Sequence, residues 1–162
     1  MVFVCLGTHD MAFNRLLTMV EECIDKGLIK EEVIAQCGCT KYSGDKIKCF
    51  DYCPGDEMDS YIQNASYIIT HGGTGTIVSA LKMGKKVIAV NRLAKYKEHT
   101  TDHQIQIISE FVDTGYILGC YEGDRLADKI TELSTFTPNV FVSNTDNVLA
   151  YLREYIDSVL NK

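Results

Sequence analysis

The stretch from Tyr67 to Ser79 constrains the fold of this 162-residue chain more than any other part of it. It begins with the β-branched and aromatic run Tyr67–Thr70, which is typical of a buried strand. Glycines follow, and from Thr76 the apolar residues have helical spacing. A helix that starts where a strand ends exposes its first N–H groups and the positive end of its dipole, which suits a phosphate or another anion. The stretch therefore predicts an anion-binding turn; the alternative is a tight turn with no ligand.

The turn combines one histidine, three glycines and two threonines in six residues: His71, Gly72, Gly73, Thr74, Gly75 and Thr76. Glycine suits such a site because a side chain would hold the ligand away from the backbone. We therefore expect these residues to surround the bound group.

The rest of the chain alternates short apolar runs with amphipathic segments. Strands are expected at Val2–Leu6, Val33–Cys37, Ile47–Tyr52, Tyr67–Thr70, Val87–Val90 and Tyr116–Cys120. Helices are expected over 13–24, after Pro54, over 76–83, over 105–112, over 124–134 and over 148–160. This alternation predicts the α/β class, a Rossmann-like parallel sheet with helices on both faces, and the length predicts a single domain over 1–162.

Three polar loops follow strands of this predicted sheet: Gly7–Asp10, His71–Thr76 and Asn91–Gln104. In an open parallel sheet the ligand lies beyond the carboxyl ends of the strands, where the strand order reverses. We expect the three loops to converge there and to form the functional site.

Charge and cysteine content exclude several classes. The net charge of −6 disfavours nucleic-acid binding. The segment Lys82–Lys97 is basic without an acidic residue, which predicts either a solvated face or a surface for an anionic ligand or lipid. Seven cysteines and no secretory leader predict free thiols in a reducing cytoplasm. No apolar run is long enough to span a bilayer.

Metal and dinucleotide sites are disfavoured by spacing. Four cysteines lie close in sequence, but their spacing matches no common zinc knuckle, so we expect no metal: Cys37, Cys39, Cys49 and Cys53. A dinucleotide fold should carry its glycine fingerprint after the first strand, where only Gly7 occurs. The segment Gly84–Lys86 closes a helix instead of opening one, so it is not a kinase-type phosphate loop.

Four blocks in order resemble small bacterial polysaccharide glycosyltransferase subunits: Gly7-Thr8-His9 with Phe13, Arg15 and Leu16; His71-Gly72-Gly73-x-Gly75; Gly84-Lys85-Lys86-Val87-Ile88; and Glu98-His99-x-x-Asp102-His103-Gln104. Those proteins are similar to the C-terminal half of glycosyltransferase family 28 and to the catalytic subunit of the eukaryotic dolichol-linked N-acetylglucosaminyltransferase. The resemblance covers Met1 to about Ile130. It implies half of a GT-B fold, a UDP-sugar donor, inversion at the anomeric carbon and no metal or other cofactor.

The resemblance also implies a missing half. In single-chain relatives an N-terminal domain binds the lipid acceptor, so a membrane-anchored partner subunit would supply that side here. The implied reaction builds a capsular or exopolysaccharide unit on a polyprenyl-diphosphate-linked saccharide at the inner face of the membrane. The apolar stripe of the terminal helix, within 145–160, would either dock this partner or pack on the chain's own sheet.

Residue roles follow from the matched positions. Gly7, Thr8 and the amides of Gly73, Thr74 and Gly75 would hold the donor diphosphate, with His71 as a structural residue or a further phosphate contact. Asp102, His103 and Gln104 would face the donor sugar, with Gln104 binding its hydroxyls.

Two positions leave alternatives open. His9 is either the general base for the acceptor hydroxyl or a phosphate ligand or turn cap, because imidazole suits each role. Ser79 stands where related proteins often carry a ribose-binding glutamate, so either Ser79 or another group binds the ribose. The whole chain could also be a non-catalytic nucleotide-sugar sensor or scaffold that uses the same loops.

Overall fold

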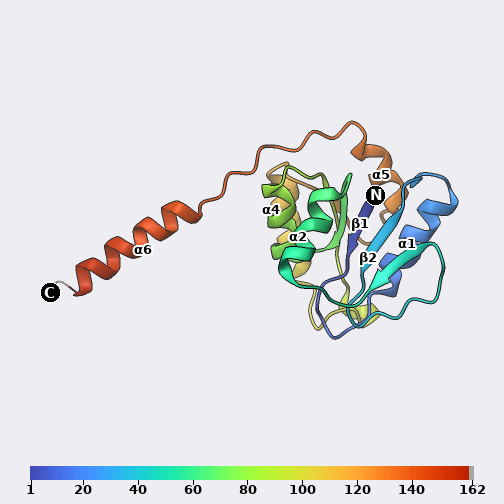
Figure 1. The fold of residues 1–162 in the computed structure, drawn as a ribbon, viewed down its shortest axis with the longest axis horizontal. Helices are drawn as coiled ribbons and strands as arrows, with labels where there is room; N and C mark the ends of the chain where they lie inside the picture. The colour runs from blue at the N-terminus through green and yellow to red at the C-terminus, as the bar shows by residue number, and fades with distance from the viewer. Residues whose placement is uncertain (161–162) are drawn as a thin grey trace.

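A computed structural model describes residues 1–160 of the chain, which form a six-stranded parallel sheet in the order β3-β2-β1-β4-β5-β6 (Figure 1). The strands are β1 (Val2–Cys5), β2 (Val33–Gln36), β3 (Ile47–Phe50), β4 (Ile68–His71), β5 (Val87–Val90) and β6 (Leu118–Cys120). The helices are α1 (Asn14–Asp25), α2 (Gly55–Asn64), α3 (Thr74–Lys82), α4 (Gln104–Asp113), α5 (Leu126–Leu133) and α6 (Thr145–Leu160), with a 3-10 turn η1 (Ala94–Tyr96). The expected fold class is confirmed.

Side chains alternate across β1 and divide the core into two layers. Val2 and Val4 pack with α1 and α5 on one face, whereas Phe3 and Cys5 pack with α2, α3 and α4 on the other. Figure 1 shows α1 and α5 on one side of the sheet and α2 and α4 on the other. Both faces are therefore covered, as an apolar parallel sheet requires.

The strand order reverses between β1 and β4, because β2 and β3 lie on one side of β1 and β5 and β6 lie beyond β4. Backbone pairing places Cys5 opposite Thr70, so both strands end at the same level. The loops after β1 and β4 are consequently neighbours, and the loop after β5 lies next to them. This confirms the expected position of the three polar loops.

Two expectations about local structure are wrong. Helix α3 begins at Thr74 instead of Thr76, so Gly75 is a helical residue and not part of the turn. The segment Lys82–Lys97 forms no single basic surface, because β5 runs through it and separates its two ends. Lys86 donates to the Leu133 carbonyl at the amino end of the sheet, whereas Arg92 is buried beyond the carboxyl end.

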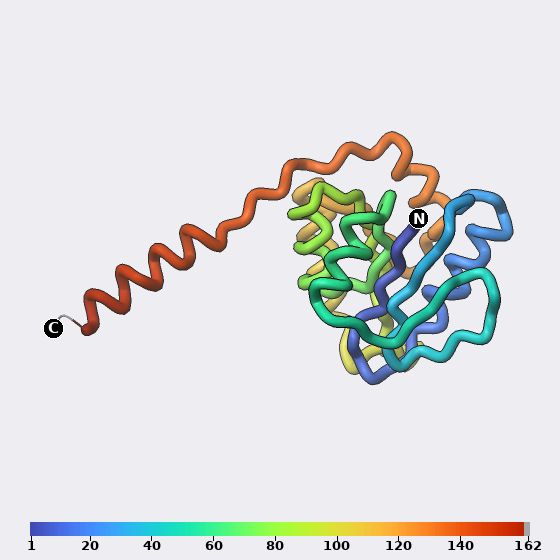
Figure 2. Tube along the Cα trace, in the orientation of Figure 1, coloured from blue at the N-terminus to red at the C-terminus, as the bar shows by residue number. Residues whose placement is uncertain are grey.

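Helix α6 stands away from the sheet on an extended connection that follows α5 (Figures 1 and 2). None of its 16 residues is buried. Apolar side chains remain half-exposed along it, among them Val148, Leu149, Leu152 and Ile156. The alternative that this helix packs on the chain's own sheet is therefore not what the structure shows. No helix within residues 1–160 has the length and apolar character needed to cross a membrane.

Candidate functional site

A cleft of about 220 Å³ lies at the switch point, between the ends of β1 and β4. Its lining includes six of the residues expected at a donor site: Gly7, Thr8, His71, Gly73, Gly75 and Thr76. Cys5, Gln36 and Met58 complete the lining. The structure thus brings the first two polar loops together around one opening.

The start of α3 supplies the donors at this cleft. The N–H groups of Thr74, Gly75 and Thr76 make no hydrogen bond within residues 1–160, whereas the Ile77 N–H already bonds the Gly73 carbonyl at 3.2 Å. Three free N–H groups and the helix dipole point the same way, which is the usual arrangement for binding an anion. The start of helix α3 therefore has the geometry that suits an anion at this cleft.

Two residues expected to hold the diphosphate, Gly7 and Gly73, already use their backbone N–H groups within the protein. The Gly73 N–H donates to the His71 carbonyl at 2.7 Å. The Gly7 N–H donates to Gln36 Oε1 at 3.0 Å, and the Gly7 carbonyl accepts from Gln36 Nε2 at 3.1 Å. Because each N–H has one hydrogen to give, these amides hold the protein and not a ligand. The prediction that the Gly73 amide holds the diphosphate is therefore wrong, and Gly7, which was expected at the diphosphate, has no free N–H to offer, although both residues line the cleft.

The glycines of the two loops differ in what would surround a side chain at each position. A Cβ atom at Gly7 or Gly73 would lie less than 3.0 Å from the His71 ring, so that ring occupies the space of both missing side chains. Gly7 also has a φ of +81°, which other residues rarely adopt. A Cβ atom at Gly72 would press on Ile108 and Gln104, whereas at Gly75 it would meet no heavy atom within 4 Å. Only Gly75 leaves space that a ligand could use.

His71 is a neutral wedge between the two loops. Its Nδ1 lies 3.2 Å from the Cys5 carbonyl oxygen, which can only accept, so Nδ1 carries the hydrogen and Nε2 keeps its lone pair. Burial lowers the pKa of His71 to about 4, further helped by the charge of Arg92. His71 therefore adds no positive charge at neutral pH, which favours its expected structural role over that of a cationic phosphate contact.

Arg92 ties the loop after β5 to the loop after β1. Its guanidinium is buried, with Nη2 donating to the Leu6 carbonyl at 2.7 Å and Nη1 to the carbonyls of Met11 at 2.7 Å and Glu98 at 2.9 Å. It also lies over the Phe13 ring, 4.7 Å from the centroid. Because Leu6 and Met11 flank the His9 turn, one side chain fixes that turn against the segment before His99.

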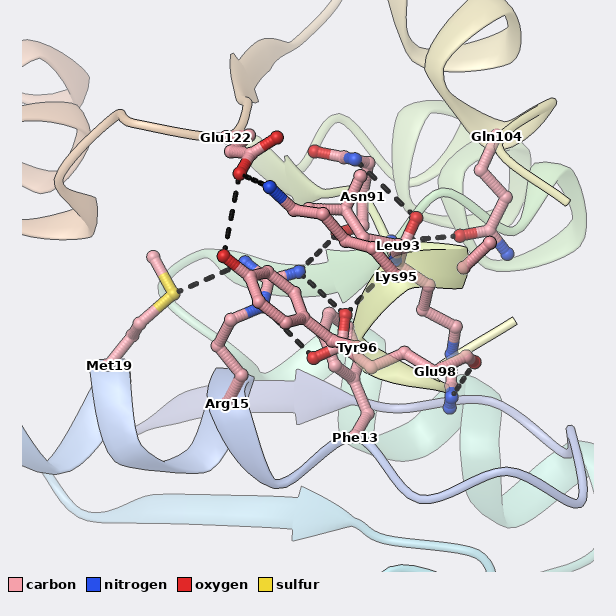
Figure 3. A network of polar contacts seen from close by, with 12 residues as sticks. Phe13, Arg15, Met19, Asn91, Leu93, Lys95, Tyr96, Glu98, Gln104 and Glu122 are labelled. Carbon is pink, nitrogen blue, oxygen red and sulfur yellow. Dashed lines mark hydrogen bonds and ion pairs between the residues drawn. The ribbon is translucent and has the colours of Figure 1, made fainter. Parts of the chain in front are cut away.

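A second arginine holds the same loop from α1 (Figure 3). Arg15 donates from Nε and Nη2 to the two carboxylate oxygens of Glu98 at 2.9 and 2.8 Å, and also to the Asn91 carbonyl at 2.7 Å. Glu98 Oε2 additionally accepts from the Leu93 N–H at 3.0 Å. This bidentate pair has a buried carboxylate, so it is stronger than a surface ion pair. The segment expected to be a plain polar loop is therefore anchored.

Three imidazoles gather at the outer end of the site. The ring centroids of His9 and His99 are 4.6 Å apart, and those of His99 and His103 are 5.0 Å apart. Burial and the neighbouring His9 lower the pKa of His99. The loop after β1 and the loop after β5 thus meet through histidine side chains, which brings His9 close to the predicted sugar-binding residues.

The other predicted sugar-binding residues have partners in the protein. Asp102 Oδ1 accepts from the Ala94 N–H at 2.8 Å, so it caps η1. Gln104 is buried, and its Oε1 accepts from the Arg92 N–H at 3.2 Å. In the part of the chain that the structure describes, Gln104 Nε2 makes no hydrogen bond and could still donate to a ligand. Ser79 lies further along α3 and does not line the cleft.

Sequence reasoning missed Gln36 as a residue of this region, and it placed Asp10 and Arg92 only as members of the predicted loops, with no role for either side chain. Gln36 ends β2 beside β1, and a polar residue at a strand's carboxyl end was the available signal. Arg92 carried no such signal, because arginine in a basic segment is normally exposed. The cysteines are free thiols, and no group of three metal-ligating side chains among residues 1–160 is arranged to hold an ion.

The fold and the cleft define a parallel α/β domain with a polar cleft and free backbone donors at its switch point. Residues 1–154 match the family model described as "Glycosyltransferase family 28 C-terminal domain", so the chain belongs to that family.

Known relatives agree with this assignment. The chain is 32% identical over 77 residues to "UDP-N-acetylglucosamine transferase subunit ALG13" of Saccharomyces cerevisiae, a match that covers 46% of this chain and 36% of the relative. The match thus spans about a third of that curated relative.

Solved structures match over more of the chain. The solution structure of ALG13 matches with a TM-score of 0.57 at 21% identity, covering 88% of this chain and 89% of that one. A glycosyltransferase described as that of kitacinnamycin matches with a TM-score of 0.59 at 19% identity, covering 83% of this chain and 34% of that chain. These likenesses show the fold, the C-terminal half of a GT-B protein.

Proposed function

We propose that this chain is the donor-binding, catalytic subunit of an inverting glycosyltransferase that transfers a sugar from a UDP-sugar. The observation that carries the proposal is the set of three free N–H groups at the start of α3, two of which belong to Gly75 and Thr76 in the lining of the switch-point cleft of a family 28 domain. The yeast relative is named as a subunit of a UDP-N-acetylglucosamine transferase, which supports both the donor class and a two-part enzyme.

In this proposal the donor diphosphate binds the N–H groups of Thr74, Gly75 and Thr76, and Thr8 contacts it from the other loop. Each charge-assisted hydrogen bond contributes about 1.5–3 kcal/mol. Because the UDP leaving group gains negative charge as the bond to the sugar breaks, these donors stabilise the transition state more than the ground state. The chemistry would need no metal, as the family resemblance implies.

The sugar would lie toward the loop after β5, where Gln104 Nε2 is available and His103 and Asp102 are exposed. His9 stands at the junction of the cleft and this loop, since its ring contacts that of His99. That position suits a base that takes the proton from an acceptor hydroxyl as the new glycosidic bond forms. Because Ser79 lies outside the cleft, a group other than Ser79 binds the ribose in this proposal.

The acceptor in this proposal is a polyprenyl-diphosphate-linked saccharide of a capsular or exopolysaccharide pathway, bound by a membrane-anchored partner at the inner face of the membrane. Its support is the resemblance to bacterial polysaccharide glycosyltransferase subunits. Helix α6 is the proposed docking element, since its apolar side chains have no cover within residues 1–160. The chain would then be a cytoplasmic, peripheral subunit.

The test is calorimetric titration of the purified chain, without metal, using UDP, UDP-galactose, UDP-glucuronate, UDP-N-acetylglucosamine and NAD. Tighter binding of one UDP-sugar than of UDP supports the proposal and identifies the sugar. Binding of NAD alone contradicts it. Binding of a UDP-sugar without transfer, after co-expression with the membrane partner, would favour a sensor or scaffold.

A further inference from the structure

The Nδ1 atom of His9 has two neighbours that demand opposite protonation states. The Met11 N–H lies 3.1 Å from it and can only donate, so it needs a lone pair on Nδ1. The Asp10 Oδ1 atom lies 3.0 Å from it as an ion-pair contact that lacks the alignment of a hydrogen bond in this structure, and because a carboxylate oxygen can only accept, a bond to Asp10 needs a hydrogen on Nδ1. Both bonds cannot form at once, and the two neighbours therefore select two different forms of the ring.

The choice at Nδ1 decides what the other end of the ring can do. When Met11 donates to Nδ1, a neutral imidazole carries its hydrogen on Nε2 and offers only a donor there. When Nδ1–H bonds to Asp10, Nε2 has the free lone pair that a general base needs. Only the second form can take a proton at the nitrogen that faces away from the His9 turn.

We infer that Asp10 is a positioning residue that holds His9 in its base-competent tautomer, while the Met11 amide holds the resting tautomer. The inference rests on the proposed function, in which His9 receives a proton. During transfer, the acceptor oxygen bonds to the anomeric carbon and its proton passes to His9 Nε2. The bond from that carbon to the diphosphate oxygen breaks, and its electron pair leaves with UDP. Asp10 then faces the resulting imidazolium, whose proton later passes to water.

His99 offers an internal comparison. Its Nδ1 accepts from the Thr101 N–H at 3.1 Å, which repeats the His9–Met11 turn. Within residues 1–160 no carboxylate pairs with His99, whereas Asp10 pairs with His9. The same backbone arrangement therefore leaves His99 as a donor at Nε2, and the carboxylate is what distinguishes His9.

Other charged and titratable groups around His9 do not replace Asp10. Cys39 donates from Sγ to the His9 carbonyl, and the Arg92 guanidinium bonds the Met11 carbonyl, so neither accepts from the ring. His71 is neutral and bonds Cys5, and His99 bonds Thr101. Asp10 is thus the one carboxylate in contact with this imidazole among the described residues.

The effect should be modest in the isolated chain, because the Asp10 side chain is 93% exposed and water screens the pair. We expect the loss of Asp10 to lower the population of the base tautomer, and the transfer rate with it, by about two- to fivefold. The donor contacts at α3 do not involve Asp10, so affinity for UDP should not change.

The test uses the full chain labelled with ¹⁵N, in which long-range ¹H–¹⁵N spectra report the tautomer of each histidine at pH 8. In Asp10→Ala the neutral His9 should shift to the Nε2–H form, in Asp10→Glu the Nδ1–H population should return, and in Asp113→Ala on α4 nothing should change. The same His9 tautomer in Asp10→Ala as in the unmodified chain would overturn the inference.

Calorimetry with UDP on the same samples separates this inference from the proposed function. Unchanged UDP affinity in Asp10→Ala together with a tautomer shift supports a positioning role. A large loss of UDP affinity in Asp10→Ala would overturn it, since Asp10 would then act on the donor site. If no sample, the unmodified chain included, binds UDP or a UDP-sugar, the proposed function loses its support even where the tautomer shifts.

Discussion

Substitution of Gly75 by alanine separates ligand binding from folding at this site. A Cβ atom there meets no heavy atom within 4 Å, and Gly75 has no positive φ, so the protein can accept the methyl group without strain. Gly75 is also a helical residue, and alanine is favoured over glycine in helices by up to about 1 kcal/mol. Gly75→Ala should therefore fold and should melt a few degrees higher than the unmodified chain.

Binding should respond in the opposite direction. The Cα–Cβ bond of a helical residue tilts toward the helix N-terminus, which is the direction from which a diphosphate approaches the free N–H groups. A methyl group there should remove one charge-assisted hydrogen bond, a loss of about 1.5–3 kcal/mol. At 1.4 kcal/mol per factor of ten, the affinity for UDP should fall about ten- to a hundredfold.

The assay is calorimetric titration with UDP beside a thermal melt. Gly55→Ala is the matched control, because Gly55 is the first residue of α2, has an equally open Cβ position and lies outside the cleft lining. It should gain stability and bind UDP normally. A folded Gly75→Ala that binds UDP as tightly as the unmodified chain would refute the assignment of the diphosphate to the start of α3.

Three further predictions concern stability and assembly. The pKa of His71 is lowered to about 4 in the folded chain from an ordinary 6.5, so the unfolded chain binds this proton first as the pH falls. Between pH 6.5 and 4 the unmodified chain should therefore lose about 3 kcal/mol more free energy of unfolding, measured by urea titration, than His71→Gln does. Parallel plots of unfolding free energy against pH for the two proteins would contradict the buried neutral ring. Glu98→Ala should lower the free energy of unfolding by about 3 kcal/mol, because it leaves Arg15 and the Leu93 N–H without their partner. Glu122→Ala breaks only the exposed ion pair with Lys95 and should lower it by less than about 1 kcal/mol. Equal losses in the two variants would refute the anchoring role of Glu98. Leu152→Asp should leave the melting temperature of the isolated chain unchanged and should abolish co-purification with a membrane partner, and a lower melting temperature would show that α6 packs on the chain itself.

The strands were predictable because glycines and polar loops mark their ends clearly in the sequence. All six expected strands are present, with ends that differ by at most two residues, since short β-branched runs between glycines and polar loops leave little choice. The position of the cleft was predictable too, because the carboxyl ends of parallel strands must share one edge.

The hydrogen bonds that join the loops could not be predicted from the sequence. The Gly7 N–H is taken by Gln36, which is 29 residues away along the chain but on the neighbouring strand. The burial of Arg92 depends on three carbonyls from two loops, whose convergence no local pattern records. Both cases need the spatial arrangement of main-chain groups, whereas periodicity reports only which face of an element is apolar.

The wedge of His71 between Gly7 and Gly73 makes the order of substitutions matter. A larger residue at position 73 collides with the imidazole, so it becomes tolerable only after position 71 has lost its ring. The reverse order passes through a chain with a clash between two loops of the site. Position 7 has no such route, because its φ of +81° disfavours a side chain whatever occupies position 71. Diversification of this turn should thus begin at position 71, and a double-mutant cycle between 71 and 73 would show strong, sign-changing epistasis.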